Sequence, residues 1–347
     1  MKILVLVRRY RKNQSEADEH DFNYTKKTLK EIEKSKKNIK IKFDTFKNYK
    51  EYIKWCPNYT IFLGFDSSIF KIKENFTSSK FCIWAKCYAS SIDNKLSSIY
   101  EEFDYIFDSC FLNILNKKKN YFYLPTAIHK NYNYSFLKKT YLSFFNKKID
   151  NQIENADLIF SGSPRFNRRD NYRQELISLL SKKNIKILIC SSKKLWMKSN
   201  FKTNTSNENN IQFISSNYWA TGRVYNNAKF VLDLPWLDTV IEKLEKNYDP
   251  QFALGWNVFR SGYNGANLIT YKCDMNKDIG LNEQNCSFYS SNVENIANLA
   301  DEIEYIIKNI DKAKIQYMKS NLKKHFVENH TYHKRWNFII DKITYEK

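Results

Sequence analysis

The chain has 347 residues, which is enough for about two domains of ordinary size. Hydrophobic residues make up 42% of it and aromatic residues 16%, so the chain can bury a core and is not intrinsically disordered. Its 57 Lys and Arg against 37 Asp and Glu give a net charge of +20, which favours nucleic acid, an anionic membrane surface or phosphorylated substrates as partners. An AT-rich coding bias also enriches lysine, and the lysines are spread along the whole chain, so the charge by itself does not select among these partners.

The seven cysteines form no Cys-x-x-Cys pair, and the apolar segment at the start, Met1–Val7, is too short for a secretory signal. No apolar run approaches the roughly 18 residues that span a bilayer. These features predict reduced thiols and a cytoplasmic location. They leave two classes open, a soluble enzyme and a binding protein.

Short apolar runs alternate with charged helical stretches in the first half of the chain. Strands are predicted at Ile3–Val7, Ile39–Phe43, Tyr59–Phe65, Phe81–Ala85, Tyr105–Phe107 and Tyr121–Leu124. A helix is predicted over Thr25–Lys36, where Leu29 and Ile32 share one face. Strands separated by helical patterns are typical of βαβ units and a mostly parallel sheet.

A second α/β series follows a polar, aromatic connection at residues 131–155. Its predicted strands are Leu158–Ser161, Ile185–Cys190, Lys229–Leu234 and Asn267–Tyr271, and its predicted helices are Asp170–Ser181, Val293–Ile310 and Tyr332–Lys342. Six of the seven glycines lie after residue 160. Because glycine is rare in this chain, those that remain mark tight turns or close approaches of the backbone, and they indicate that the second half binds a nucleotide or a phosphate.

A glycine turn at the end of the strand Leu158–Ser161 is the first candidate for binding chemistry. Gly162 and Ser163 lie between this strand and the next helix, where backbone N–H groups suit a diphosphate. Arg165 and Arg169 follow within seven residues, with Arg173 further along the helix as a reserve. Arginine binds phosphate oxygens through two parallel hydrogen bonds. The alternative is a solvated basic turn without a ligand.

Two further segments are weak signals by themselves. Trp256–Thr270 contains a helical stretch that ends at Gly265 before a strand, as an ordinary connection with a glycine C-cap would. His330 and His333 are three residues apart, but no carboxylate or cysteine cluster accompanies them, so a metal site is not expected. Thr331 between them is predicted to cap the last helix.

In chain order these segments resemble the nucleotide-binding domain of GT-B-type glycosyltransferases, and in particular the bacterial family that includes spore-maturation-type proteins. Four motifs carry the resemblance: the turn Ser161–Ser163 with the arginines after it, the strand entry Tyr225–Leu232, the stretch Asn257–Thr270, and the sequence His330–Arg335. The opening turn is also similar to that of phage DNA β-glucosyltransferases. The resemblance covers about residues 155–340.

The resemblance implies an α/β fold of two Rossmann-like domains that face a cleft. Residues 1–130 would form the acceptor domain and 131–155 a linker. Residues 156–330 would bind the nucleotide sugar, and residues 331–347 would form a helix that crosses back to the first domain. The implied reaction transfers a sugar from a nucleotide-diphosphate sugar without a metal or another cofactor. The residues that would bind the donor are Gly162, Ser163, Arg165, Arg169, Arg173, Asn257, Arg260, Ser261 and Gly265.

Two positions depart from the resembled family. Asn257 stands where the family has Arg, and Arg260 stands where it has the Glu that binds the ribose. A carboxylate accepts hydrogen bonds from ribose hydroxyls, whereas a guanidinium only donates. Either Asn257, Ser261 or Asn264 takes that role, or the donor differs from the usual nucleotide sugar. A catalytically inactive relative that binds a nucleotide or a carbohydrate is a third hypothesis.

An inverting enzyme would also need a general base, and the first domain offers three candidates. Ser15–Asp21 follows the first strand after a short loop, and at the carboxyl end of a strand His20 and Asp21 would face the cleft. A histidine beside carboxylates can have a pKa suited to proton transfer at neutral pH. Asp66, after the strand that ends near Gly64, is the third candidate. The alternative is that Asp18–Asp21 forms the acidic start of the next helix.

The acceptor expected from the resemblance is a glycan or a lipid-linked acceptor of surface-polysaccharide assembly. Such an enzyme would be cytoplasmic, with peripheral contact at the inner membrane face. DNA is the alternative acceptor, because lysines hold phosphates and the abundant tyrosines and phenylalanines can stack on bases. The sequence shows no concentrated basic stripe, which weighs against DNA.

Overall fold

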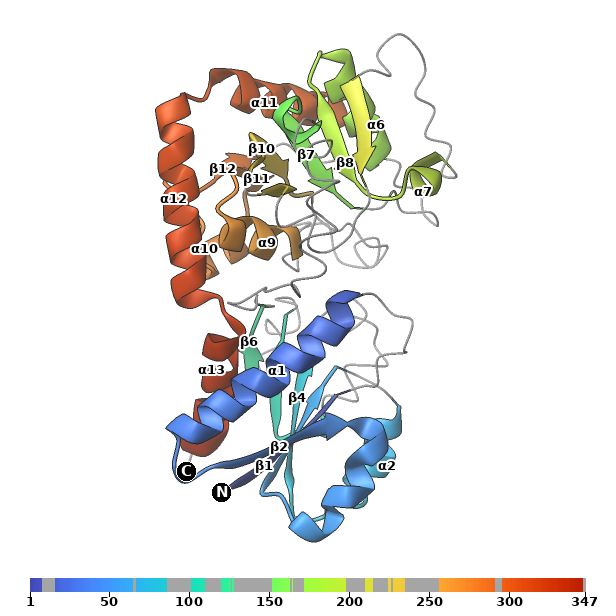
Figure 1. Cartoon of the computed structure of the whole chain (residues 1–347), viewed down its shortest axis with the longest axis vertical. Helices are drawn as coiled ribbons and strands as arrows, with labels where there is room; N and C mark the ends of the chain where they lie inside the picture. Colours follow the sequence, from blue (N-terminus) through green and yellow to red (C-terminus); the bar gives the residue numbers. More distant parts are fainter. Residues whose placement is uncertain are drawn as a thin grey trace, which may run out of the picture.

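The computed structural model describes residues 1–7, 16–64, 67–85, 101–109, 120–125, 127, 152–162, 164, 172–197, 210–214, 224–225, 227–234, 256–290 and 295–345. Within these ranges the chain forms two six-stranded sheets, one above the other in Figure 1. Every strand pair in both sheets is parallel. The predicted α/β fold of two Rossmann-like domains is therefore confirmed.

The first sheet has the strand order β2-β1-β3-β4-β5-β6. Its strands are β1 (Lys2–Val7), β2 (Lys40–Thr45), β3 (Tyr59–Leu63), β4 (Lys80–Ala85), β5 (Tyr105–Asp108) and β6 (Tyr121–Tyr123). The α-helices α1 (Glu16–Ser35) and α2 (Ser68–Lys73) and the 3₁₀ helix η1 (Phe46–Trp55) accompany it. On the edge strand β2, the exposed Lys40 and Lys42 protect the open edge from pairing with another chain.

The alternation of side-chain direction along β1 explains why this strand is apolar throughout. Ile3, Val5 and Val7 belong to the cluster that packs against α1 and the C-terminal helix α13 (Tyr332–Tyr345). Leu4 and Leu6 point to the opposite face and pack against η1 and α2. Since successive side chains in a strand point to opposite faces, a parallel strand covered on both sides needs a continuous apolar run.

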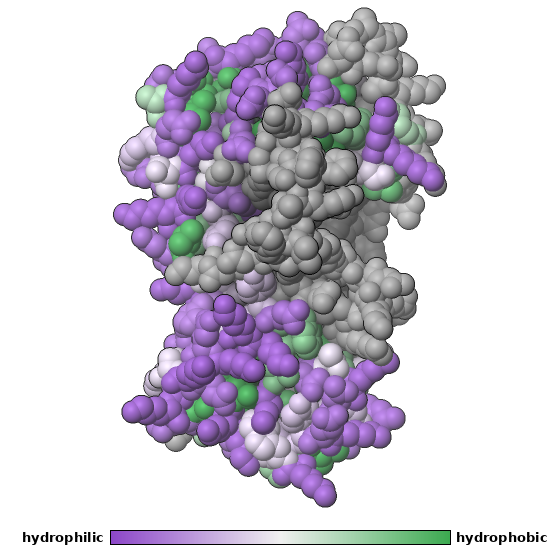
Figure 2. Space-filling model, viewed as in Figure 1, coloured by the Kyte–Doolittle hydropathy of each residue, from purple (hydrophilic) through white to green (hydrophobic). Residues whose placement is uncertain are grey.

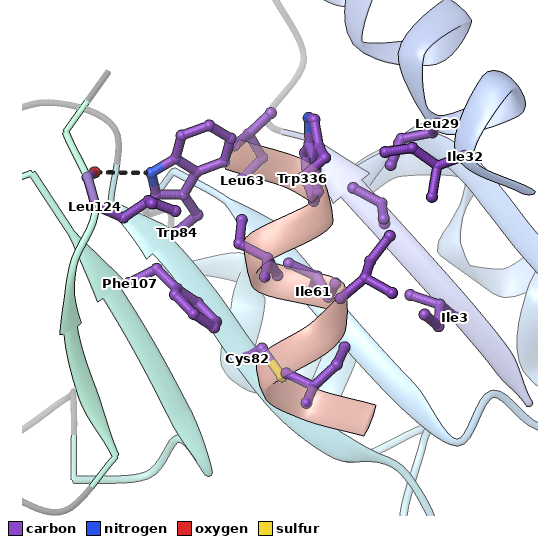
Figure 3. Close-up of a cluster of buried hydrophobic side chains, with 14 of the residues drawn as sticks. Ile3, Leu29, Ile32, Ile61, Leu63, Cys82, Trp84, Phe107, Leu124 and Trp336 are labelled. Carbon is purple, nitrogen blue, oxygen red and sulfur yellow. Dashed lines mark hydrogen bonds between the residues drawn. The ribbon is translucent and has the colours of Figure 1, made fainter. Parts of the chain in front are cut away.

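The C-terminal helix α13 docks on the first sheet, although it follows the second sheet in the chain. Trp336 on α13 is fully buried and meets Trp84 of β4 edge to face, with 5.3 Å between the ring centroids (Figure 3). The Trp84 indole N–H donates a hydrogen bond to the Leu124 carbonyl oxygen at 3.3 Å. The end of the chain thus completes the core of the first domain.

The second sheet has the strand order β12-β11-β10-β7-β8-β9. Its strands are β7 (Leu158–Ser161), β8 (Ile187–Cys190), β9 (Ile211–Ile214), β10 (Phe230–Leu232), β11 (Leu268–Tyr271) and β12 (Ser287–Tyr289). The accompanying helices are α6 (Tyr172–Lys182), α7 (Lys193–Met197), α9 (Trp256–Asn264), α10 (Asp274–Asp278), α11 (Ile296–Asn309) and α12 (Lys312–Asn329). Counted from β7 as the first strand, the order is 3-2-1-4-5-6, as in dinucleotide-binding domains.

A chain of hydrogen bonds joins the two domains where α12 passes into α13. Arg335 donates from Nε to the Pro125 carbonyl oxygen of the first domain at 3.1 Å and from its terminal nitrogen to His330 Nδ1 at 2.6 Å. Because Nδ1 accepts, the ring proton is on Nε2, which faces the Ile279 carbonyl oxygen of the second domain at 2.9 Å. Thr331 Oγ1 accepts from the Lys334 N–H at 3.4 Å, so the predicted cap of this helix is confirmed.

Several elements differ from the expectations. Helix α1 begins at Glu16, nine residues before the predicted start. His20 and Asp21 therefore lie in its first turns, in agreement with the alternative that Asp18–Asp21 forms the acidic start of this helix. The strands β9 and β12 and the helix α12 were not predicted. The two strands are short and carry polar residues, and α12 buries only Met318, Leu322 and Phe326, too few for a clear helical pattern. Most of the predicted linker 131–155 lies outside the described residues.

The packing of Trp336 predicts a large loss of stability on truncation. Replacing Trp336 by Ala should lower the free energy of unfolding by about 3–5 kcal/mol, because a fully buried indole leaves a cavity. Tyr345→Ala on the same helix is the control, since that side chain is 79% exposed and should change stability by under about 0.5 kcal/mol. Equal losses in urea denaturation would contradict the docking of α13.

Burial predicts a pH-dependent contribution from His330. Desolvation first, and then the charge of Arg335, lower the pKa of His330 from 6.5 to about 3. The folded chain therefore holds this ring neutral, and its stabilising contribution, present above pH 6.5, is lost as the pH falls toward 3. His330→Gln keeps a donor and an acceptor but does not titrate. The variant should lose less free energy of unfolding than the wild type between pH 7 and 4.5, and equal losses would refute this role.

Candidate functional site

The strand order of the second sheet reverses between β7 and β10. We call the carboxyl ends of these two strands, with the segments that follow them, the crevice. Chain connections leave these neighbouring strands in opposite directions, and in open parallel sheets ligands bind at the carboxyl ends of such a strand pair. Gly162 follows β7, and Asp233 and Leu234 follow β10. The first turn of α9 lies at the same edge, because Asn257 contacts the Ser161 carbonyl oxygen. The crevice therefore combines a glycine turn with the N-terminal end of a helix.

Gly162 occupies a position with little room for a side chain. A Cβ there would lie 2.9 Å from Phe160 Cζ and 3.6 Å from an Arg173 guanidinium nitrogen. Its carbonyl oxygen accepts a hydrogen bond from the Trp196 indole N–H at 3.2 Å, which holds this carbonyl group in place. The predicted phosphate turn thus begins at a constrained glycine. Its continuation, Ser163, Arg165 and Arg169, lies outside the described residues.

Arg173, the reserve candidate, turns back across the crevice from the first turn of α6. Its guanidinium carbon lies 5.7 Å from the centroid of the Phe160 ring, at the end of β7. A terminal nitrogen donates to the Leu234 carbonyl oxygen after β10 at 3.4 Å. The side chain therefore connects the two strands that border the crevice and brings a positive charge next to Gly162.

Asn257 ties three segments together at this edge. Its Nδ2 donates to the Ser161 carbonyl oxygen at 2.7 Å, and its Oδ1 accepts from the Tyr225 hydroxyl at 2.9 Å. Burial raises the pKa of Tyr225 well above its ordinary value, so the phenol keeps the proton that it donates. Asn257 thereby holds the first turn of α9 against the end of β7.

Arg260 lies one turn further along α9 and is half-buried. Its positive charge acts on Cys190 at the end of β8 and on Tyr225, in both cases against the effect of burial, which raises their pKa values. The guanidinium is therefore close to the carboxyl edge of the sheet. A cation at this place favours an anionic group of a ligand, in contrast to the carboxylate of the resembled family.

Ser261 and Gly265, two of the predicted donor-binding residues, are buried at the C-terminal end of α9. Ser261 is fully buried. Gly265 has a φ of +66° and ends α9 in a Schellman motif, with hydrogen bonds from Gly265 N–H to Gly262 and from Ala266 N–H to Ser261. A Cβ on Gly265 would meet Lys323 of α12 at 3.1 Å. The C-terminal half of α9 thus packs on α12, while its first turn reaches the crevice.

Asp233 is a buried carboxylate at the crevice and is not among the predicted site residues. It is 2% exposed, and its Oδ2 accepts from the Thr270 hydroxyl at 3.2 Å. Its backbone carbonyl oxygen accepts from the Tyr289 hydroxyl at 3.0 Å. The position of Asp233 in the sequence indicates this site, because an acidic residue directly after the apolar run Phe230–Leu232 lies where a parallel strand ends.

The candidate bases of the first domain follow strands that border its own crevice. The first sheet changes direction between β1 and β3. Asp66 lies two residues beyond Gly64 after β3 but outside the described residues, and so do the side chains of His20 and Asp21 in the first turns of α1. The catalytic roles of these three residues stay predictions.

No metal site or membrane span is found among the residues that the structure describes. In these ranges no three His, Cys, Asp or Glu side chains lie together as potential ligands of one ion. His325 and His330 both face the Ile279 carbonyl oxygen through Nε2, at 2.7 and 2.9 Å. None of the helices in this part of the chain is both long and apolar enough to span a bilayer.

Comparison with solved structures finds this architecture in proteins that align with the present chain over nearly the whole length of both chains. A glycosyltransferase from Rickettsia africae aligns with a TM-score of 0.63 at 14% identity, over 100% of this chain and 99% of that one. HepE of Anabaena in complex with UDP-glucose gives 0.61 at 10% identity, over 99% and 100% of the chains. Sucrose-phosphate synthase of Thermosynechococcus elongatus gives 0.62 at 9% identity, over 100% of both.

The fold is that of the GT-B glycosyltransferases. At these identities the likeness establishes the shared fold. A search with the sequence against protein-family models and curated proteins finds no match. The resemblance to the spore-maturation-type family therefore stays a prediction.

The position of Asn257 predicts coupled losses of stability. Asn257→Ala removes both of its hydrogen bonds and should cost about 1–3 kcal/mol, since the Ser161 carbonyl and the Tyr225 hydroxyl lose their partner. Tyr225→Phe should cost about 0.5–1.5 kcal/mol, and the double variant should cost less than the sum. Asn264→Ala, which removes a bond within α9, is the control. If the losses in the free energy of unfolding of the two single variants add up in the double variant, Asn257 does not link the three segments.

Proposed function

We propose that this protein transfers a sugar from a nucleotide-diphosphate sugar to a glycan or a lipid-linked acceptor. The observation that carries the proposal is the crevice between β7 and β10. There the constrained Gly162 begins the predicted phosphate turn, the first turn of α9 lies at the same edge, and Arg173 bridges the two strands. Such an edge provides N–H dipoles and cations for a diphosphate.

One neighbour in shape, solved in two complexes, supports the nucleotide sugar as the donor. HepE was solved with UDP-glucose and also with UDP, and the present chain aligns with it over nearly its whole length. We infer a uridine diphosphate sugar as the first donor to test. In this proposal Ser163, Arg165 and Arg169 continue the phosphate turn that Gly162 begins, and Arg260 adds a positive charge toward the ligand.

The leaving diphosphate gains negative charge as the glycosidic bond to it breaks. Cations and N–H groups that are already in place stabilise this charge without reorganising during the reaction. The proposed mechanism uses protein cations for this purpose and no metal ion. In an inverting reaction His20, Asp21 or Asp66 would accept the proton of the acceptor hydroxyl.

Removal of single arginines tests the donor site. In isothermal titration with UDP, Arg165→Ala and Arg169→Ala should each weaken binding about 10- to 100-fold, because each loses a charge-assisted hydrogen bond of about 1.5–3 kcal/mol. Lys186→Ala is the matched control, since this exposed lysine precedes β8 at the opposite edge of the same sheet.

The control should bind UDP like the wild type. If both arginine variants also keep the wild-type affinity, the phosphate turn is not the donor site. A thermal-shift screen of other nucleoside diphosphates identifies the base if UDP itself gives no binding.

A further inference from the structure

A pocket lies where the first domain meets the end of helix α12. Its walls come from α1, from the last turn of α12 and from the first turn of α13, and its volume is about 470 Å³. Pockets that bind small molecules have volumes of about 300–1,000 Å³. Figure 1 shows α1 beside α13, below the end of α12. We call this space the junction pocket and define it by Tyr24, Lys27, Thr28, Glu31, Glu328 and Lys334.

The junction pocket is separate from the donor crevice. Helix α9 begins at the crevice, where Asn257 binds the Ser161 carbonyl oxygen. Near the other end of α9, burial first and then the charge of Tyr24 raise the pKa of Tyr263, so Tyr24 of the pocket lies close to this end. With a rise of about 1.5 Å per residue, the helix from Asn257 to Tyr263 is about 9 Å long. A ligand in the pocket is therefore not bound at the crevice itself.

Two lysines and two glutamates face the junction pocket without pairing. Lys27 and Glu31 lie four residues apart on α1, at a spacing at which opposite charges often pair. Glu328 lies on α12 and Lys334 on α13, and all four side chains are exposed. In the part of the chain that the structure describes, none of the four side chains forms an ion pair or a hydrogen bond. The pocket thus offers cationic donors and anionic acceptors in equal number.

Two buried threonines add hydroxyl groups to the lining. Thr28 is 8% exposed, and its hydroxyl has no hydrogen-bond partner among the described residues. Thr331 is 5% exposed, and its Oγ1 accepts from the Lys334 N–H at 3.4 Å. A buried hydroxyl without a partner destabilises the folded chain. A ligand that forms a hydrogen bond with Thr28 would remove this cost.

We propose that the junction pocket binds an uncharged saccharide, which in the proposed reaction is a part of the acceptor glycan remote from the reacting hydroxyl. The role of this saccharide as acceptor rests on the proposed function. A sugar hydroxyl both donates and accepts hydrogen bonds, so carboxylates, ammonium groups and hydroxyls can all bind one saccharide. The half-buried Tyr24 and Val327 add apolar surface for the C–H groups of a sugar ring.

The balance of charge favours a neutral ligand over an ionic one. An anion in the pocket would lie next to Glu31 and Glu328, and a cation would lie next to Lys27 and Lys334, in each case with repulsion between like charges. Figure 2 shows the front of the lower domain, where α1 runs in Figure 1, as a mostly hydrophilic surface. Such a surface lacks the large apolar patch that is typical of a binding site for another protein.

Saturation-transfer NMR tests the proposal on the full chain. The probes are cellobiose, lactose, maltotriose and triacetylchitotriose, with triglycine as a zwitterion of similar size. At least one of the saccharides should receive saturation from the protein, and triglycine should not. The proposal is overturned if no saccharide receives saturation, or if triglycine alone does.

Variants that remove charge locate the binding of a saccharide that passes this test. The double variant Glu31→Ala, Glu328→Ala should raise its Kd at least about 10-fold, because hydrogen bonds to two carboxylates are lost. The double variant Lys27→Ala, Lys334→Ala should raise the Kd as well, whereas an anionic ligand would bind more tightly once the acids are removed. Thr28→Val, which keeps the shape of the side chain, should raise the Kd about 2- to 10-fold.

A matched control uses the opposite face of the first sheet. The double variant Glu51→Ala, Glu74→Ala on η1 and at the end of α2 removes the same charge at two exposed positions. It should bind the saccharide like the wild type. Equal losses in this variant and in Glu31→Ala, Glu328→Ala would overturn the proposal, because they would show an effect of net charge.

The affinity for UDP is measured in parallel. Every variant should bind UDP like the wild type, because the donor crevice lies at the other end of α9. A wild type that binds UDP and none of the saccharides would overturn the junction pocket and leave the proposed function standing. A wild type that binds a saccharide but no nucleoside diphosphate would contradict the proposed function and leave the pocket standing.

Discussion

The parallel pairing of every described strand determines where functional residues can lie. In each sheet all carboxyl ends are at one edge, and the change of direction leaves a crevice between two neighbouring strands. In the second sheet this crevice lies between β7 and β10. The turn after β7, the buried Asp233 after β10 and the first turn of α9 meet there although up to about a hundred residues separate them in the sequence.

Packing around the crevice uses polar side chains as structural links. Asn257 joins the end of β7 to α9, Thr270 binds Asp233, and Arg173 reaches from α6 to the end of β10. These contacts fix the relative positions of the segments at this edge of the sheet before any ligand binds. Binding sites that are formed in advance lose less conformational entropy on binding, so a rigid edge favours affinity for a ligand.

The end of the chain joins the two domains. Helix α12 packs on the second domain through Leu322 and Phe326, and α13 buries Trp336 in the first. Between them Arg335 and His330 connect Pro125 of one domain to Ile279 of the other. A link of this kind constrains how the carboxyl edges of the two sheets approach each other.

The sequence predicted those features that depend on local pattern. The apolar runs of β1 and β7 predicted buried parallel strands. The glycine after β7 predicted a close approach of the backbone, and Thr331 predicted the start of a helix. The sequence did not predict the features that depend on tertiary contacts. The direction of Arg173 depends on the ends of β7 and β10, and the importance of Asp233 follows only from the strand order. Strand β12, with the sequence Ser-Phe-Tyr, forms because β11 offers a partner.

The central claim is that a nucleoside diphosphate binds in the crevice between β7 and β10. A crystal structure of the chain with UDP tests it most directly. We expect the diphosphate at the turn that begins with Gly162, within hydrogen-bonding distance of backbone N–H groups and of at least one of Arg165, Arg169 and Arg173. A diphosphate bound elsewhere on the chain, with this turn empty, would contradict the account.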